Sequence, residues 1–409
     1  MTDVVVTGIG VVTPIGTGKE EFFEALVQGR SGAARIGSFD PSGLPVQIAC
    51  EVPDFDVKDY ISSREAGRMD RFSHLAVAAA SLAWDDAGCS SIADAERVGV
   101  VIGSGIGGLS TIEREHSNLL EGGPRRVSPF MVPKLMPNAA AGAVAMRFHV
   151  YGPNFAPTSA CATGAHAVGE AYRYIQAGLC DVMLTGGSEA AITPLTVSAF
   201  ARMGALSRRN DEPKLASRPF DAERDGFVCA EGAGVLVVES RDHAERRGAP
   251  ILARIVGYGA SADAHHVTQP DPDGHGATLA MRRALEDAGE TPDAVDYVNA
   301  HGTSTPFNDR IETVALKDTF GVEAKRVPVS STKSHTGHML GAAGAVEAAA
   351  TVMAIERGIV PPTINLTSPD PECDLDYVAE GARETVVRFA LSNSFGFGGQ
   401  NACLAFCAV

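Results

Sequence analysis

Short apolar runs that end in or near glycine recur along the chain and alternate with alanine-rich segments. The runs cover residues 4–8, 98–103, 182–186, 235–239, 251–257, 297–300 and 402–406. They lack strict alternation of apolar and polar residues, which is typical of strands that are buried on both faces. The alanine-rich segments with helical character cover residues 72–87, 165–177, 277–288 and 342–356. Alternation of strands and helices predicts a layered α/β fold.

A weak internal repeat indicates two related halves. The opening V-T-G-I-G-V-V-T-P has the glycine spacing of I-V-G-Y-G-A-S-A-D at 255–263. V-G-V-V-I-G-S-G at 98–105 likewise parallels V-D-Y-V-N-A-H-G at 295–302. We therefore expect an N-terminal half over 1–250 and a C-terminal half over 251–409, packed into one unit. The segments 105–150 and 190–230 make the first half longer, and we interpret them as inserted lid or interface material.

Composition narrows the class of protein. The 409 residues carry a formal net charge of -16, which argues against a nucleic-acid-binding surface. The eight cysteines form no C-x-x-C pair, so we expect reduced thiols and a cytoplasmic protein. The N-terminus lacks the basic region of a signal peptide, and no stretch of 18 apolar residues predicts a membrane span.

The segment P-T-S-A-C-A-T-G-A-H-A places Cys161 where a strand turns into a helix. At the start of a helix, unpaired N–H groups and the positive end of the dipole favour a thiolate and can hold an oxyanion. A lone cysteine is more often a buried structural thiol. Here the small neighbours Ala160, Ala162 and Gly164 would let a substrate carbonyl approach, which favours a nucleophile.

Two histidines occupy similar corners. His301 follows an apolar strand and begins a G-T-S-T turn, and His338 precedes the glycine-rich L-G-A-A-G-A. Open α/β sheets place ligand sites at the carboxyl ends of strands. One cysteine and two histidines at three strand-to-helix corners predict acyl chemistry at sulfur.

Four motifs together carry a resemblance to a known family. They are T-S-A-C-A-T-G-A-H-A, N-A-H-G-T-S-T-P-F-N-D, S-S-T-K-S-H-T-G-H-M-L-G-A-A-G-A-V-E and S-N-S-F-G-F-G-G-Q-N-A. By the order and the spacing of these motifs, which extend over essentially the whole chain, the sequence resembles the elongating β-ketoacyl-[acyl-carrier-protein] synthases. The resemblance implies the thiolase fold, an αβαβα five-layered sandwich of two duplicated halves, usually as a dimer. It also implies decarboxylative Claisen condensation of malonyl-acyl-carrier protein with a cysteine-bound acyl primer.

The resemblance assigns catalytic roles. Cys161 is the expected acyl acceptor, and its own N–H and that of Phe397 would form the oxyanion hole. His301 and His338 would drive malonyl decarboxylation and stabilise the enolate. Lys333 would organise the site, and Glu347 would support it. Phe397 also matches a gating phenylalanine between the acyl pocket and the extender entrance.

Further residues are implied as substrate, carrier and cation contacts. The expected pantetheine contacts are Thr303 and Thr305, and the expected acyl-pocket residues are Ile106, Ala160, Met131 or Met203, and Leu340. The expected carrier-docking cations are Arg64, Arg68 and Arg209. A structural Na⁺ or K⁺ site is implied at Asn299, Ala300, Glu347, Ser392 and Asn393. No other cofactor is expected, since the substrates are carried on the phosphopantetheine of the acyl carrier protein.

Several alternatives stay open from the sequence. Position 335 is histidine, where the family more often has an apolar residue, so His335 is either a polar substitution behind the site or an influence on substrate range. The same reaction could serve a type II polyketide or polyene pathway. A non-catalytic chain-length partner subunit shares the fold but lacks the nucleophile, which Cys161 disfavours. The dimer could be a homodimer or a heterodimer with such a partner.

Overall fold

The computed structural model describes residues 2–89 and 94–409. The strands are β1 (Val4–Thr13), β2 (Gly16–Thr17), β3 (Ala34–Arg35), β4 (Ile48–Ala49), β5 (Val98–Gly103), β6 (Asn154–Phe155), β7 (Val182–Glu189), β8 (Gly232–Ser240), β9 (Ala253–Ala262), β10 (Tyr297–Asn299), β11 (Val329–Ser330), β12 (Ile359–Val360), β13 (Arg383–Glu384), β14 (Phe389–Gly396) and β15 (Gln400–Cys407). The helices are α1 (Lys19–Val27), α2 (Ser63–Ala66), α3 (Arg71–Asp86), α4 (Leu109–Gly122), α5 (Met131–Leu135), α6 (Ala139–Phe148), α7 (Thr163–Gln176), α8 (Pro194–Met203), α9 (Arg241–Arg247), α10 (His275–Ala288), α11 (Pro306–Phe320), α12 (Lys333–Thr336) and α13 (Ala343–Arg357).

The order of the strands repeats in the two halves. The first half is ordered β6-β5-β7-β8-β1, and the second is ordered β11-β10-β14-β15-β9. Numbered along the chain within each half, both orders read 3-2-4-5-1. The halves meet where β1 pairs antiparallel with β9, at Val4 and Ile255. The repeat seen in the sequence is therefore a repeat of topology, while the expected division at residue 250 stays a prediction.

Each half combines parallel and antiparallel pairing. Strand β5 pairs parallel with β6 and β7, and β10 pairs parallel with β11 and β14. Their neighbours β8, β1, β15 and β9 run antiparallel. Strands β1, β5, β7 and β8 are buried along their whole length, which explains why their sequences are continuous apolar runs.

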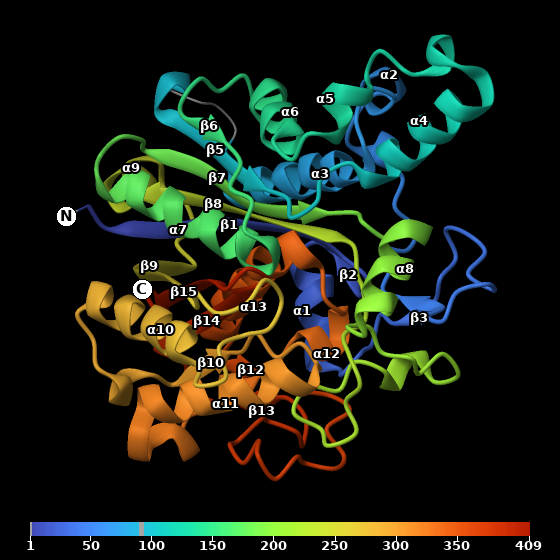
Figure 1. Cartoon of the computed structure of the whole chain (residues 1–409). Coiled ribbons are helices and arrows are strands. Elements are labelled where there is room, and N and C mark those ends of the chain that lie inside the picture. Colours follow the sequence, from blue (N-terminus) through green and yellow to red (C-terminus); the bar gives the residue numbers. More distant parts are fainter. Residues whose placement is uncertain (1, 90–93) are drawn as a thin grey trace.

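Helices and sheets form five layers (Figure 1). The strands of the two halves form two sheet layers. Helices α3 and α6 cover the layer of the first half from outside, and α10 and α11 cover the layer of the second half. Helices α7 and α13 lie between the two layers. The two central helices approach closely at Gly164 and Gly344. A Cβ on Gly164 would lie 2.7 Å from the Ala345 nitrogen, and one on Gly344 would lie 2.7 Å from the Ala165 nitrogen. The expected thiolase-like sandwich is confirmed.

The structure extends several predicted elements. The run at 4–8 continues as a strand to Thr13, and the segment 105–150 contains α4, α5 and α6. The very short strands, such as β6 and β11, were not predicted, because two paired residues leave no periodic pattern in a sequence. No helix in the described part of the chain is long and apolar enough to span a membrane.

Candidate active site

Cys161 stands at a strained turn ahead of α7. The short helix Ala160–Ala162 leads into α7, and Ala160 has a φ of 49°, a left-handed conformation that residues with a Cβ rarely adopt. The second half repeats this corner ahead of α13, where Leu340 has a φ of 46°. Gly341 there follows Leu340 as Cys161 follows Ala160. The duplicated corner therefore carries a nucleophile in one half only.

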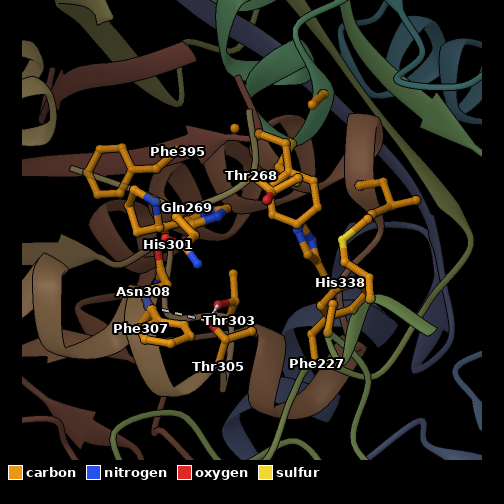
Figure 2. Close-up of a pocket in the computed structure, with 18 of the residues that line it drawn as sticks. Phe227, Thr268, Gln269, His301, Thr303, Thr305, Phe307, Asn308, His338 and Phe395 are labelled. Atoms are coloured by element: carbon orange, nitrogen blue, oxygen red, sulfur yellow. Dashed lines mark hydrogen bonds between the residues drawn. The ribbon is translucent and has the colours of Figure 1, made fainter. Parts of the chain in front are cut away.

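Three reactive side chains converge in the interior. Ligand atoms of Cys161, His301 and His338 all lie within 4.8 Å of one another, and the three residues are buried. The two imidazole rings have centroids 5.5 Å apart and are nearly perpendicular, at 83°. Figure 2 shows both rings around the same cavity. The structure thus brings together the cysteine and the two histidines that the sequence singles out.

Hydrogen bonds fix the orientation of His301. The N–H groups of His301 and Gly302 donate to the carboxylate of Glu312, at 2.8 and 2.7 Å. The Nζ atom of Lys333 lies 3.3 Å from Nδ1 of His301. An ammonium group only donates, so Nδ1 is the acceptor and Nε2 carries the proton. His301 therefore keeps an Nε2–H donor for the cavity.

Lys333 and Glu347 form a buried ion pair. Their side chains are 1% and 2% exposed. Burial raises the pKa of Glu347 to about 7, although the charge and hydrogen bond of Lys333 lower it. Removal of one partner from such a pair leaves a buried charge without compensation. The pair therefore holds the ammonium group in place behind His301.

His338 differs from His301 in its contacts. Within residues 2–89 and 94–409, neither ring nitrogen of His338 has a hydrogen-bond partner, and the ring packs edge-on against Phe227 at 5.2 Å. Burial, followed by the charge of Lys333, lowers the pKa of His301 and of His338 well below the usual value. Both imidazoles are therefore neutral near pH 7, and the nitrogens of His338 are free for substrate.

The thiol of Cys161 is protonated at rest. Burial raises its pKa to about 11, while Lys333 and the N–H of Phe397 lower it. The helix start led us to expect a thiolate, but loss of solvation outweighs that contribution in this closed cavity. The N–H of Phe397 thus acts on the sulfur of Cys161, next to the position where an oxyanion donor would be needed. The nucleophile therefore has to pass its proton to a base during attack.

The reactive groups open into a cavity of about 400 Å³. The expected substrate and gating residues that line it are Ile106, Ala160, Met203, Thr303, Thr305, Leu340 and Phe397. Of the two expected methionines, Met203 reaches the cavity, whereas Met131, the first residue of α5, is not among its lining residues. The hydroxyls of Thr303 and Thr305 lie 2.9 Å apart, and Figure 2 shows them facing the cavity from the start of α11.

The expected cation residues present unpaired oxygens. Asn299 Oδ1, Glu347 Oε2, Ser392 Oγ and Asn393 Oδ1 are buried, and none has a hydrogen-bond partner among the residues that the structure describes. The Nδ2 atoms of the two asparagines donate to Tyr297 and Glu312, which fixes the direction of both amides. Asn299 in β10 is paired with Ser392 in the neighbouring strand β14, and Ala300 follows Asn299 in the sequence. Orphaned buried oxygens call for a ligand, and oxygen donors suit an alkali cation.

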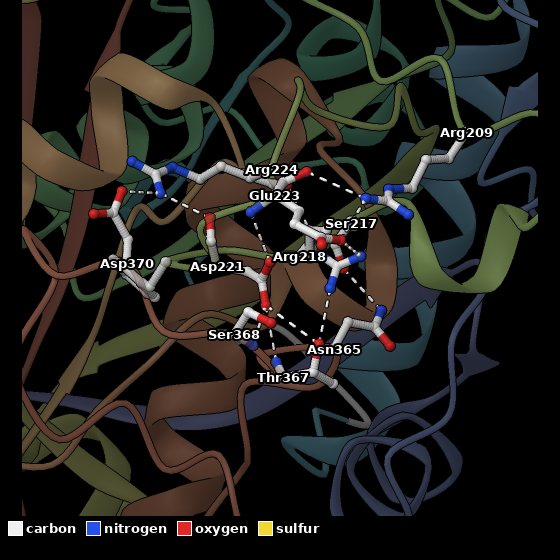
Figure 3. Close-up of polar contacts among 12 residues, drawn as sticks. Arg209, Ser217, Arg218, Asp221, Glu223, Arg224, Asn365, Thr367, Ser368 and Asp370 are labelled. Carbon is white, nitrogen blue, oxygen red and sulfur yellow. Dashed lines mark hydrogen bonds and ion pairs between the residues drawn. The ribbon is translucent and has the colours of Figure 1, made fainter.

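The expected docking arginines lie on different elements. Arg64 belongs to α2, and Arg68, just after it, stacks over the ring of Phe130 at 5.1 Å. Arg209 follows α8 and pairs with Glu223 at 3.1 Å (Figure 3). Arg64 and Arg68 are exposed, so their charges are available to a partner, whereas that of Arg209 is partly neutralised within the chain.

His335 lies behind the site. It is fully buried, and its two ring nitrogens lie 3.2 Å from the Arg30 carbonyl oxygen and 2.8 Å from that of Pro362. It does not line the cavity. These contacts agree with a polar residue that joins two segments, the first of the two interpretations.

Glu189 was missed by sequence reasoning. At the end of β7, it accepts hydrogen bonds from Ser104 Oγ and from the N–H groups of Gly105, Ile106 and Gly341, at 2.8 to 3.2 Å. It thereby joins the turn that carries Ile106 to the corner ahead of α13. A glutamate after a glycine pair at the end of a buried strand was the available signal.

Comparisons with known proteins agree with this site. The models for the N-terminal and C-terminal domains of β-ketoacyl synthases match residues 1–244 and 252–367. A 3-oxoacyl-[acyl-carrier-protein] synthase 2 of Synechocystis sp. is 51% identical over 404 residues, 98% of this chain and 97% of that protein.

Two solved structures are also similar over the full length. The ishigamide ketosynthase/chain length factor is 38% identical with a TM-score of 0.94, covering 100% of this chain and 99% of that chain. A type II polyketide ketosynthase in complex with its acyl carrier protein, AntDE:AntF, is 35% identical with a TM-score of 0.93, covering 100% of both chains. The chain therefore belongs to the β-ketoacyl synthase family.

Proposed function

We propose that this protein is a β-ketoacyl-[acyl-carrier-protein] synthase that elongates fatty acyl chains by decarboxylative Claisen condensation. The observation that carries the proposal is the group of Cys161, His301 and His338, whose ligand atoms lie within 4.8 Å in one cavity. A cysteine nucleophile beside two neutral imidazoles suits acyl transfer followed by enolate chemistry.

The first half-reaction loads the primer. Sγ of Cys161 attacks the thioester carbonyl of an acyl carrier, and the N–H groups of Cys161 and Phe397 stabilise the oxyanion. A nitrogen of His338 takes the thiol proton, because neither nitrogen is hydrogen-bonded within the described part of the chain and the ring is neutral. The C–S bond to the carrier then breaks, and the leaving thiolate receives that proton. The acyl group remains on Cys161, with its chain along Ile106 and Leu340.

The second half-reaction extends the chain. The malonyl thioester binds with its carbonyl oxygen toward His301 Nε2–H and His338. The bond to the carboxylate breaks, CO₂ leaves, and the electron pair forms an enolate that the two imidazoles stabilise through hydrogen bonds. The enolate carbon attacks the acyl-cysteine carbonyl. The bond from carbon to Cys161 Sγ then breaks, which releases the β-ketoacyl carrier, and the Cys161 thiolate takes up one proton from solvent to restore the thiol.

Fatty-acid elongation is preferred over polyketide assembly. The relative named as a 3-oxoacyl-[acyl-carrier-protein] synthase 2 is 51% identical, against 38% for the ishigamide ketosynthase/chain length factor and 35% for the type II polyketide ketosynthase. An assay with acyl carrier, malonyl carrier and no reductase separates the two. A fatty-acid enzyme stops after adding one two-carbon unit, whereas a polyketide ketosynthase adds several unreduced units. Intact mass of the carrier reads the difference.

The acyl carrier protein is the proposed substrate partner, with Arg64, Arg68 and Arg209 as docking cations. We propose a cytoplasmic homodimer, and a heterodimer with a chain-length subunit is the alternative. Exposed apolar side chains on the segment 105–150 support a contact with another protein subunit. Leu120, Val132 and Met146 are each more than half exposed. Light scattering of the purified chain separates the two assemblies, because only the homodimer forms without a second subunit.

A structural Na⁺ or K⁺ is the only further ligand that we propose. The oxygens of Asn299, Glu347, Ser392 and Asn393, with the backbone at Ala300, would hold it. The ion would offset the Glu347 charge and fix the ends of β10 and β14. Its test is a higher unfolding temperature in KCl or NaCl than in tetramethylammonium chloride at equal ionic strength. Equal temperatures in all three salts would refute it.

The central experiment follows acylation of the protein. Wild-type protein mixed with a medium-chain acyl carrier should gain one acyl group, located on Cys161 by peptide mass spectrometry, and malonyl carrier should then release CO₂ and product. Cys161→Ser should lose both steps, since an alcohol is far less ionised than a thiol. Acyl groups on Cys180 or Cys229 in place of Cys161 would overturn the proposal.

A further inference from the structure

The turn that carries Thr303 and Thr305 is held in a strained conformation. Ser304, between them, has a φ of 69°, in the left-handed region that favours glycine. Both threonines line the cavity and face each other through their hydroxyls. Residues with a side chain stay in this region only when their surroundings over-determine the backbone. Contacts from outside the turn must therefore hold this conformation.

Two residues of the segment 218–226 donate hydrogen bonds to Ser304. The Arg218 N–H donates to Ser304 Oγ at 2.9 Å, and the Gly226 N–H donates to the Ser304 carbonyl oxygen at 3.1 Å. From the other side, the Ser304 N–H donates to Asp309 Oδ1 at 3.2 Å. The backbone N–H, the carbonyl oxygen and the Oγ atom of Ser304 are thus each hydrogen-bonded to a residue outside the turn.

Arg224 holds the end of the same turn with its guanidinium group. Nε donates to the carbonyl oxygen of Thr305 at 3.1 Å, and Nη2 donates to that of Pro306 at 3.0 Å. Nη1 donates to the Asp221 carbonyl at 2.8 Å and to the Asp370 carboxylate at 2.6 Å (Figure 3). The planar fork of arginine therefore grips two successive carbonyls, a geometry that the single point charge of lysine cannot reproduce.

Two aspartates balance the buried charge of Arg224. Its side chain is 4% exposed, with Asp370 at 2.6 Å and the fully buried Asp309 at 3.6 Å. A buried cation that is fully bonded and paired in this way has one stable position. Arg224 is not among the cavity-lining residues, so it acts on the cavity only through the turn.

We propose that Arg224 is a positioning residue that fixes the Thr303–Thr305 turn in the conformation that receives the pantetheine arm of acyl carriers. The inference rests on the proposed function, in which these hydroxyls contact pantetheine. Loss of the two guanidinium donors lets Ser304 relax out of the left-handed region and turns the hydroxyls of Thr303 and Thr305 away from the arm. The reaction centre at Cys161 keeps its own contacts.

The test compares two thioesters of the same acyl group. Octanoyl-pantetheine carries the arm, whereas S-ethyl thiooctanoate has no amide for the threonines to bind. Acylation of Cys161 is followed by intact mass as a function of thioester concentration. We expect Arg224→Lys to raise the concentration for half-maximal rate at least tenfold with octanoyl-pantetheine. The maximal rate with that thioester, and all rates with the S-ethyl thioester, should stay within twofold.

Arg310→Lys is the matched control. Arg310 lies on α11, the helix that follows the turn, and its ion pair with Glu372 is 40% exposed at the arginine side chain. This variant makes the same chemical change and should leave both thioesters unaffected. Thr305→Val should reproduce the selective loss, and the double variant with Arg224→Lys should lose no more than the larger single loss, because both changes act through one contact.

Each outcome has one reading. Equal losses with both thioesters, or additive losses in the double variant, overturn the proposal in favour of a general stabilising role. An unchanged dependence on octanoyl-pantetheine overturns it as well. Failure of the wild-type protein to acylate Cys161 from octanoyl-pantetheine would instead reject the proposed function itself. Should Arg224→Lys unfold at the assay temperature, the cycle of Arg224→Lys and Thr305→Val is measured at a lower temperature at which both variants are folded.

Discussion

The ammonium group of Lys333 lies between Nδ1 of His301, at 3.3 Å, and the carboxylate of Glu347. Lys333 therefore sets which nitrogen of His301 carries the proton, although it does not line the cavity. Glu347 in turn keeps the ammonium charge compensated in an interior where its side chain is 1% exposed. The relationship links a buried ion pair to the donor that faces substrate, and it yields the first prediction.

Lys333→Met should slow malonyl decarboxylation about 100-fold, the effect of losing one preorganised donor at a developing oxyanion. The variant frees the tautomer of His301 and leaves Glu347 without its partner. It should also lose stability, by about 3–5 kcal/mol for a broken buried pair. Adding Glu347→Gln should restore stability but not decarboxylation. We would measure CO₂ release and urea unfolding; full recovery of both in the double variant would contradict the role given to Lys333.

The two active-site imidazoles should stay neutral across the physiological pH range. Burial and Lys333 lower the pKa of His301 and His338, so each ring is neutral above its lowered pKa and charges only in more acid solution. NMR of ¹³C-labelled histidine rings, assigned with His301→Gln and His338→Gln, should show no titration of these two signals between pH 6 and 8. A midpoint near 6.5 for either signal would show that the cavity is open to water.

Glu189→Gln should make Cys161 more acidic. The negative charge of Glu189 helps to raise the pKa of the Cys161 thiol, and the neutral amide of glutamine lacks that charge. Alkylation of Cys161 by iodoacetamide, followed by mass between pH 7 and 10, should therefore be faster in the variant at each pH. The amide also turns an N–H toward the donors of Gly105 and Gly341, so we expect a lower unfolding temperature. Slower alkylation than wild type would refute the electrostatic role.

Ile106→Phe should shorten the longest primer that the protein accepts. Ile106 lines the cavity beside Cys161, and the larger ring fills space that would hold several methylenes, each contributing about 0.8 kcal/mol of burial. Loading of six- to sixteen-carbon acyl carriers should shift to shorter chains, while malonyl decarboxylation is spared. Met131→Phe is the companion variant, because Met131 lies off the cavity within one chain and should leave the length profile unchanged.

Charge reversal at the arginines should weaken carrier binding. Arg64→Glu with Arg209→Glu should raise KM for acyl carriers about tenfold and leave acyl-pantetheine nearly unaffected, since reversal of rim charges acts on encounter. Arg282→Glu, an exposed arginine on α10, serves as control. Arg209 gives up its pairs with Glu212 and Glu223 in this variant, so circular dichroism should accompany the assay. Equal losses with carrier and pantetheine substrates would assign these arginines to the fold.

The sequence by itself determined the layered fold and the reactive residues. Runs such as 98–103 are apolar because β5 is buried on both faces, and that pattern is local and readable. Cys161 and His301 could be selected because each lies between a strand and a helix, and such corners gather at one end of a sheet. The expected strand-to-helix corner at His338 was wrong, because His338 follows the short helix α12 and precedes the turn ahead of α13. The motifs then added the family resemblance and the roles of Lys333 and Glu347.

Tertiary structure alone decided what depends on packing across the chain. Burial, which no local pattern measures, keeps the Cys161 thiol protonated where the helix start had suggested a thiolate. Glu189 and Arg224 became visible only when distant segments met, since Glu189 is 84 residues from Gly105 in sequence and Arg224 is 81 residues from Thr305. The choice of Met203 over Met131 at the cavity was likewise set by how α8 and α5 pack. Sequence spacing specifies elements and corners, whereas desolvation and long-range hydrogen bonds exist only after the halves have packed together.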